Sequence, residues 1–64
     1  MKHITQTTVA SGVIGQHNHE WTIIKLYDKK YDSESYELFI NEEHIASLGS
    51  VVEALTVLVD QFCE

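Results

Sequence analysis

The shortness of the chain, together with its single cysteine, limits what it can fold into more than any other feature. The sequence has 64 residues, and Cys63 has no second cysteine with which to form a disulfide bond. A domain of this length buries only about 60% of the surface of its unfolded chain, so its core is thin. Such domains usually need disulfides, a metal or a partner subunit. We therefore expect a single domain, residues 1–64, that folds in a reducing compartment and gains stability by self-association.

The first three quarters of the chain carry the pattern of an antiparallel β-sheet. β-Branched and aromatic residues alternate with polar ones in residues 4–14, 21–27 and 35–40. A shorter fourth segment, residues 44–48, follows a polar turn. The connecting segments are short, and short connections favour antiparallel pairing of strands that are neighbours in sequence. The sequence therefore predicts a meander of three to four strands.

A helix is predicted over residues 50–62, which gives an α+β fold with the helix packed on one face of the sheet. Ser50 is a good N-cap, and Glu53 stands three residues later, at the spacing of a capping box. Apolar residues cover about 180° of this helix, whereas packing on one sheet needs only a little over 100°. The residues expected in the core are Leu55, Leu58, Val59 and Phe62. The remaining apolar surface is expected to face a second copy of the chain, in a homodimer.

The predicted sheet has two partly apolar faces. The helix is expected to cover one of them, which would consist of Ile24, Leu26, Tyr36, Leu38 and Ile40. Trp21, Tyr27 and Phe39 would then form an aromatic patch on the other face, and exposed apolar patches usually mark interfaces. The predicted interface residues are Trp21, Tyr27, Phe39, Val52, Val59 and Cys63. Two alternatives stay open: the faces are reversed, or the N-terminal segment folds over the patch.

Charge is divided unevenly along the chain. The first 30 residues hold all four lysines and two carboxylates, a balance of +2, while the last 34 hold eight carboxylates and no Lys or Arg, which gives the total of −6. Nucleic acid is therefore not an expected partner, whereas basic protein surfaces are. Glu34, Glu37, Glu42 and Glu43 form a predicted acidic surface. It serves either to keep the protein in solution or to imitate DNA phosphates, as an inhibitor of a DNA-binding protein would. Mutual repulsion is expected to raise the pKa of some of these carboxyls.

The main candidate metal ligands are His17 and His19, which are two residues apart and can point at one ion. The plausible further ligands are His3, His44, Glu20 and Cys63. Zinc needs two further ligands, or one and a water, and the sequence offers no recognised spacing for them. A small metal-binding module is therefore a third hypothesis, and no bound metal or cofactor is expected. Cys63 has no activating base in the sequence and is expected to be a small packed residue.

No catalytic constellation is found, so the chain is not expected to be an enzyme. It has neither a glycine-rich phosphate loop nor a nucleophile elbow. The N-terminal segment lacks the apolar core of a signal peptide, and no segment approaches the roughly 20 apolar residues of a membrane span. The leading hypothesis is a cytoplasmic, non-enzymatic accessory module of bacterial or phage type that binds another protein and forms a homodimer.

Overall fold

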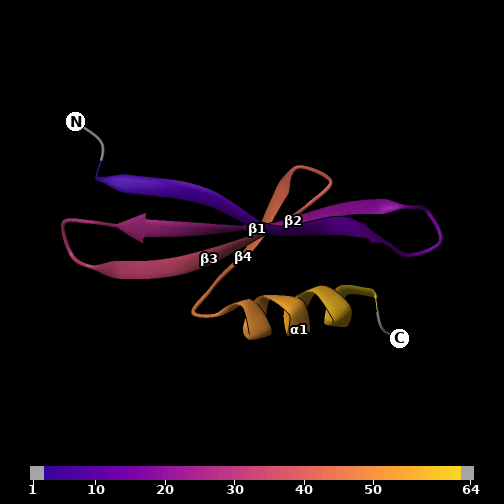
Figure 1. Cartoon of the computed structure of the whole chain (residues 1–64). Helices are drawn as coiled ribbons and strands as arrows, with labels where there is room; N and C mark the ends of the chain where they lie inside the picture. The colour runs from indigo at the N-terminus through magenta and orange to yellow at the C-terminus, as the bar shows by residue number, and fades with distance from the viewer. Residues whose placement is uncertain (1–2, 63–64) are drawn as a thin grey trace.

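The fold is α+β, with four antiparallel strands in one open sheet followed by a single C-terminal helix packed against it (Figure 1). The computed structural model describes residues 3–62. The elements are β1 (Ile4–Ile14), β2 (His19–Asp28), β3 (Ser33–Ile40), β4 (Glu43–Leu48) and α1 (Val51–Phe62). The strands lie in the sheet in the order β1-β2-β3-β4, so each pairs with its neighbours in sequence. The predicted meander and C-terminal helix are confirmed.

The turn between β3 and β4 is anchored to the start of β2. Asn41 and Glu42 both have positive φ, 53° and 68°, which is the pattern of the two-residue type I′ hairpin turn. The backbone N–H of Asn41 donates to the carbonyl of Glu20 at 2.7 Å, and the Asn41 side-chain Oδ1 accepts from the Glu20 N–H at 3.1 Å. One asparagine therefore holds the end of β3 beside the beginning of β2.

The register of the sheet decides which residues of β2 face the helix. Trp21 is paired with Ile40, and Ile23 is paired with Leu38, so these four side chains share a face because paired antiparallel residues point the same way. The core consists of Ile23, Leu38, Ile40, Ala54 and Leu58. The prediction that the helix covers Ile24 and Leu26 is wrong, although it is right for Tyr36, Leu38 and Ile40. Side chains alternate between the two faces along β2 and along β3, as expected. Which residues of β2 share a face with which residues of β3 is decided by the strand pairing, and neither strand alone determines it.

A β-bulge at Val9 changes the alternation of β1. Thr8 is paired with Ile24 and Ala10 with Ile23, so Val9 has no partner of its own. Thr5 and Thr7 therefore share the helix side with the later residues Ala10, Gly12 and Ile14. A regular alternation along residues 4–14 would have placed Ser11 and Val13 with Thr5 and Thr7, whereas the register shift at the bulge puts Ser11 and Val13 on the opposite face.

The helix begins with the predicted capping box. The Glu53 N–H donates to Ser50 Oγ at 3.2 Å, and the Glu53 carboxylate accepts from the Gly49 N–H at 3.1 Å. The helix packs through Ala54, Val57, Leu58 and Phe62. The prediction that Leu55 and Val59 lie in the core is wrong, because both are exposed, and Val57 packs in their place. The helix is rotated about its axis so that one flank of its apolar arc points away from the sheet.

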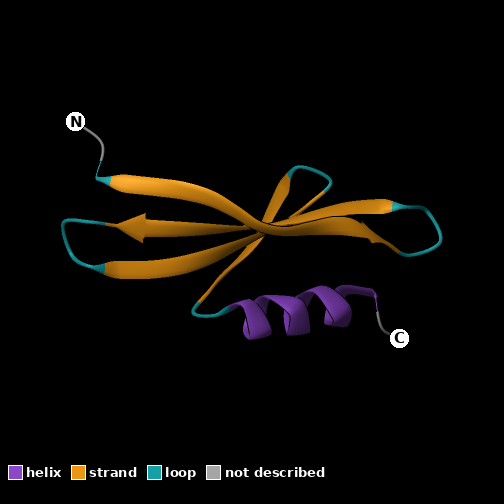
Figure 2. Cartoon of the chain, in the orientation of Figure 1, coloured by secondary structure: helices purple, strands orange, loops and turns teal. Residues whose placement is uncertain are grey.

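The helix covers only part of one face (Figure 2). It packs mainly against β3 and β4, and it lies under the end of the sheet that carries the β1–β2 loop. The molecule is 41 Å long, whereas a helix of 12 residues spans about 18 Å. The other end of the sheet, with the N-terminal half of β1 and the β2–β3 loop, extends past the helix (Figure 2).

Candidate interaction surfaces

A stripe of three apolar residues on α1 is exposed, and we call it the helix stripe. Val52, Leu55 and Val59 are 73%, 39% and 56% exposed. Their spacing of i, i+3 and i+7 places them along one side of a helix. Val52 and Val59 were predicted interface residues, and the structure leaves both uncovered. Cys63, the third predicted helix residue, lies outside the described residues.

The helix stripe faces the β1–β2 side of the molecule. At the end of the helix, the Phe62 ring lies 5.0 Å from the His19 ring at the start of β2. Gln61, on the other side of the helix axis from Phe62, lines a depression with Ile45 of β4, and Phe62 and His19 line the same depression. At 100° per residue, the stripe lies on the Phe62 side of the helix axis, whereas Glu53 and Asp60 lie on the Gln61 side. The apolar flank therefore faces inward across the sheet, and the acidic flank faces outward beyond β4.

The predicted aromatic patch does not exist as one surface. Trp21 and Tyr27 lie on the helix side of the sheet, and Phe39 lies on the opposite side, because Phe39 is paired with Thr22. The Trp21 ring covers Gly12, where an added Cβ would be 2.9 Å from the ring. Tyr27 donates its hydroxyl to Asp32 at 2.8 Å, and this hydrogen bond raises the pKa of Tyr27 above its ordinary value. The three aromatics therefore have three different environments.

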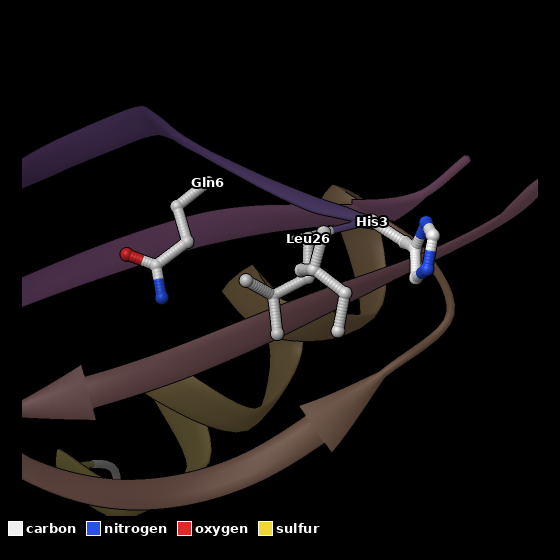
Figure 3. Close-up of a pocket in the computed structure, with 4 residues that line it drawn as sticks. His3, Gln6 and Leu26 are labelled. Carbon is white, nitrogen blue, oxygen red and sulfur yellow. The ribbon is translucent and has the colours of Figure 1, made fainter. Parts of the chain in front are cut away.

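The face opposite the helix has an apolar strip of its own. Ile24, Leu26 and Phe39 lie there half-buried, and no helix of the described residues covers them. At the edge of this face, His3, Ile4, Gln6 and Leu26 surround a shallow depression beside β1 (Figure 3). In Figure 3 the Leu26 side chain lies between those of Gln6 and His3. The depression is open to solvent, and its lining includes the imidazole of His3 but no carboxylate or hydroxyl that could act together with it.

The four residues of the predicted acidic surface lie at different places. Glu34 pairs with Lys25 at one end of β3, and Glu42 and Glu43 lie at the turn at its other end. Glu37 lies between them on the face opposite the helix, at 13% exposure. In the part of the chain that the structure describes, these carboxylates do not form one continuous row.

Glu37 forms the best-connected polar cluster of the protein. Its Oε1 accepts hydrogen bonds from Ser47 Oγ and lies 2.8 Å from His44 Nε2. The bond from Ser47 lowers the pKa of the Glu37 carboxyl, and the His44 bond adds to this, against the opposing effect of burial. This shift is opposite in direction to the increase expected from repulsion. Ser47 donates to the carboxylate and not to the imidazole, so the cluster lacks the order of a nucleophile activated by a base.

The two candidate metal ligands lie near each other. The rings of His17 and His19 are 6.1 Å apart, and His19 Nδ1 is hydrogen-bonded to Asn41 Nδ2 at 2.8 Å. Because an amide nitrogen only donates, this contact occupies the Nδ1 lone pair. Among residues 3–62, no group of three or more His, Cys, Asp or Glu side chains is arranged to hold a metal ion. His19 instead contributes to packing against Phe62.

Comparisons with protein-family models, with curated proteins and with solved structures find no match to this chain. No helix in the described part of the chain has the length and apolar character needed to cross a membrane.

Sequence reasoning found part of these surfaces and missed part. Val52 was predicted to be an interface residue and is exposed, Val59 was assigned both to the core and to the interface, and Leu55 was assigned to the core alone. Ile24 and Leu26 were assigned to the covered face. A helical wheel gives the width of an apolar arc, but it does not say which part of the arc meets the sheet. The rotation of the helix about its own axis decides that.

Proposed function

We propose that this chain is a small non-enzymatic module that binds another protein and works as a homodimer. The observation that carries the proposal is the exposed helix stripe of Val52, Leu55 and Val59. Exposed apolar residues grouped on one side of an element usually mark an interaction surface. Five buried residues form the whole core of residues 3–62, so covering the stripe would add substantially to the buried apolar area.

The geometry of the polar groups supports a binding role over a catalytic one. The depression beside β1 is shallow, and the Glu37 cluster has its hydrogen bonds directed at the carboxylate. The residues of the predicted acidic surface are dispersed over both faces and both ends of β3; they are Glu34, Glu37, Glu42 and Glu43. This dispersal gives little support to the hypothesis that the chain imitates a DNA backbone. Protein binding through apolar contact is therefore the function that the surfaces support best.

Capture of partners from cell extract at low and high salt tests this proposal. At about 0.5 M salt, charge–charge attraction is screened over a few ångströms, while apolar contacts persist or strengthen. We expect the captured protein to remain bound at high salt and to be lost with Val52→Lys, because the stripe is needed for the homodimer that binds the partner. Capture that disappears at high salt, and that Val52→Lys leaves unchanged, would support the acidic alternative instead.

A further inference from the structure

The helix-side face of the sheet is only half covered. Four strands spaced about 4.8 Å apart make a sheet roughly 19 Å wide, whereas a helix with its side chains is about 10 Å wide. α1 packs mainly against β3 and β4; it also helps to bury Ile23 of β2, and its last residue, Phe62, lies beside His19. The part of this face farther from α1 includes Ala10 and Trp21, which pack against the edge of the core, and Gly12, which lies under the Trp21 ring. We call this region the bare half-face.

The bare half-face and the helix stripe adjoin each other. The stripe lies on the flank of α1 that points toward β1 and β2, the flank that ends at Phe62 beside His19. Trp21, which is half-buried, lies over Gly12 in the bare half-face. The exposed side of α1 and the adjoining part of the sheet therefore form one continuous, angled apolar surface, which we call the step.

We propose that a second copy of this chain fills the step, with the two α1 helices packed antiparallel about a two-fold axis. This inference rests on the homodimer in the proposed function and assigns its contact surface. In this arrangement, the helix stripe of each copy meets the stripe and the bare half-face of the other. The step of the first copy is filled by the second copy, and the step of the second copy is filled by the first in the same way. A two-fold interface requires this self-complementarity. Two helices side by side then match the width of one four-stranded sheet.

Charge and size agree with a second copy as the occupant. Each copy carries −6, so two copies meet most easily where neither presents carboxylates. Glu53 and Asp60 lie on the opposite flank of α1 from the stripe, which holds no charged residue. A stable interface removes about 600–1,000 Å² from each partner. That is roughly an eighth to a fifth of the 4850 Å² surface of this chain.

The main competing contact is the free edge of β1. This edge strand has 11 residues without a charged side chain, and uncharged edges tend to pair with other strands. The bulge at Val9 interrupts it, and edge pairing would leave the helix stripe exposed. Gln6 lies on β1 before the bulge and is exposed, so Gln6→Lys is a suitable probe of edge pairing.

Sedimentation of matched variants tests the assignment. Val59→Lys changes the helix stripe, and Val13→Lys changes a valine of nearly equal exposure, 56% against 58%, on the opposite face of the sheet. Both changes reduce the net negative charge by the same amount, so general repulsion falls equally. Wild type is expected to sediment as a dimer of 14.6 kDa, twice 7.3 kDa. Val59→Lys is expected to weaken dimerisation at least about tenfold, because a charge would be buried at the contact, and Val13→Lys is expected to leave it unchanged.

Trp21 supplies a second readout, because it is the only tryptophan and lies in the bare half-face. Its emission should shift to shorter wavelength as wild type is concentrated through the dimerisation range, and Val59→Lys should abolish that shift. If Val59→Lys folds poorly by circular dichroism, Val52→Lys, at a position 73% exposed, replaces it.

The outcomes separate this inference from the proposed function. A dimer that persists in Val59→Lys and is lost in Gln6→Lys would overturn the helix contact while leaving the homodimer intact. A wild-type protein that sediments as 7.3 kDa at all concentrations and salt levels would overturn both. Loss of the dimer in Val13→Lys alone would place the contact on the opposite face and would also refute the inference.

Discussion

Replacing Gly12 with alanine tests the packing of Trp21, because the indole lies where the new methyl group would go. The added Cβ would be 2.9 Å from Cζ2 of Trp21, 3.1 Å from Cε2 and 3.2 Å from Nε1. A real Cβ does not approach a ring this closely, so the indole or the β1 backbone has to move. Either movement disturbs contacts between Trp21 and the core around Ile23.

Two opposing effects set the size of the change. Overpacking costs about 1–3 kcal/mol, while alanine in a strand interior gains about 0.5–1 kcal/mol over glycine by reducing the freedom of the unfolded chain. The difference gives an expected loss of about 1 kcal/mol in the free energy of unfolding. A chain of 64 residues has only a few kcal/mol of stability, so this loss should be easy to measure.

Urea unfolding at one fixed protein concentration, followed by Trp21 fluorescence and by circular dichroism, measures both consequences. Gly12→Ala should lower the unfolding midpoint and also change the emission of the folded state, since the ring is displaced. Ser11→Ala is the control, because Ser11 is the neighbouring residue and faces the other side of the sheet. A Gly12→Ala protein that is more stable than wild type, with unchanged emission, would refute the placement of the ring over Gly12.

Three further predictions follow from the core, from Glu37 and from the histidines. Leu58→Ala should cost about 2–5 kcal/mol in thermal or urea unfolding, because Leu58 is 3% exposed, and an unchanged melt would mean that the helix face is wrongly assigned. The pKa of Glu37 is lowered in the folded state, so this residue stabilises the fold at pH values above its unfolded pKa. That stabilisation is lost as the pH falls through the lower folded pKa. The free energy of unfolding of wild type should therefore exceed that of Glu37→Gln by less in acid than at neutral pH. A difference that is equal at pH 7 and pH 3 would contradict this. Untagged protein should hold no stoichiometric zinc by elemental analysis, and one equivalent of metal that disappears with His17→Ala would refute the assignment of His17 and His19 to packing and loop roles.

Local features of the sequence were enough to predict the elements of the fold. The capping box of Ser50 and Glu53 gave the start of the helix, because its hydrogen bonds depend only on residues within one turn. The β-branched segments gave the strands, and their short connections gave the meander. These features need no knowledge of what lies across the sheet.

Features that depend on the pairing of distant residues were not predictable in the same way. The facing of Trp21 depends on its pairing with Ile40, and a shift of one residue in that register moves every side chain of β2 to the other face. The exposure of Leu55 and Val59 depends on the rotation of α1 on the sheet, which the sequence of the helix leaves open. The sequence therefore predicted the exposure of Val52, but it placed Trp21, Tyr27 and Phe39 on one face, whereas the strand pairing puts Phe39 on the opposite face from the other two.

The unpaired residue at Val9 makes β1 unusual in its tolerance of changes in length. Removing one residue from a regular strand reverses the facing of every residue on one side of the deletion. Removing Val9 would instead join Thr8 to Ala10, whose partners Ile24 and Ile23 are already consecutive in β2. All other residues of β1 would keep their partners and their faces. Val9 is thus the position in this strand at which related sequences could differ in length by one residue and still fold into the same sheet.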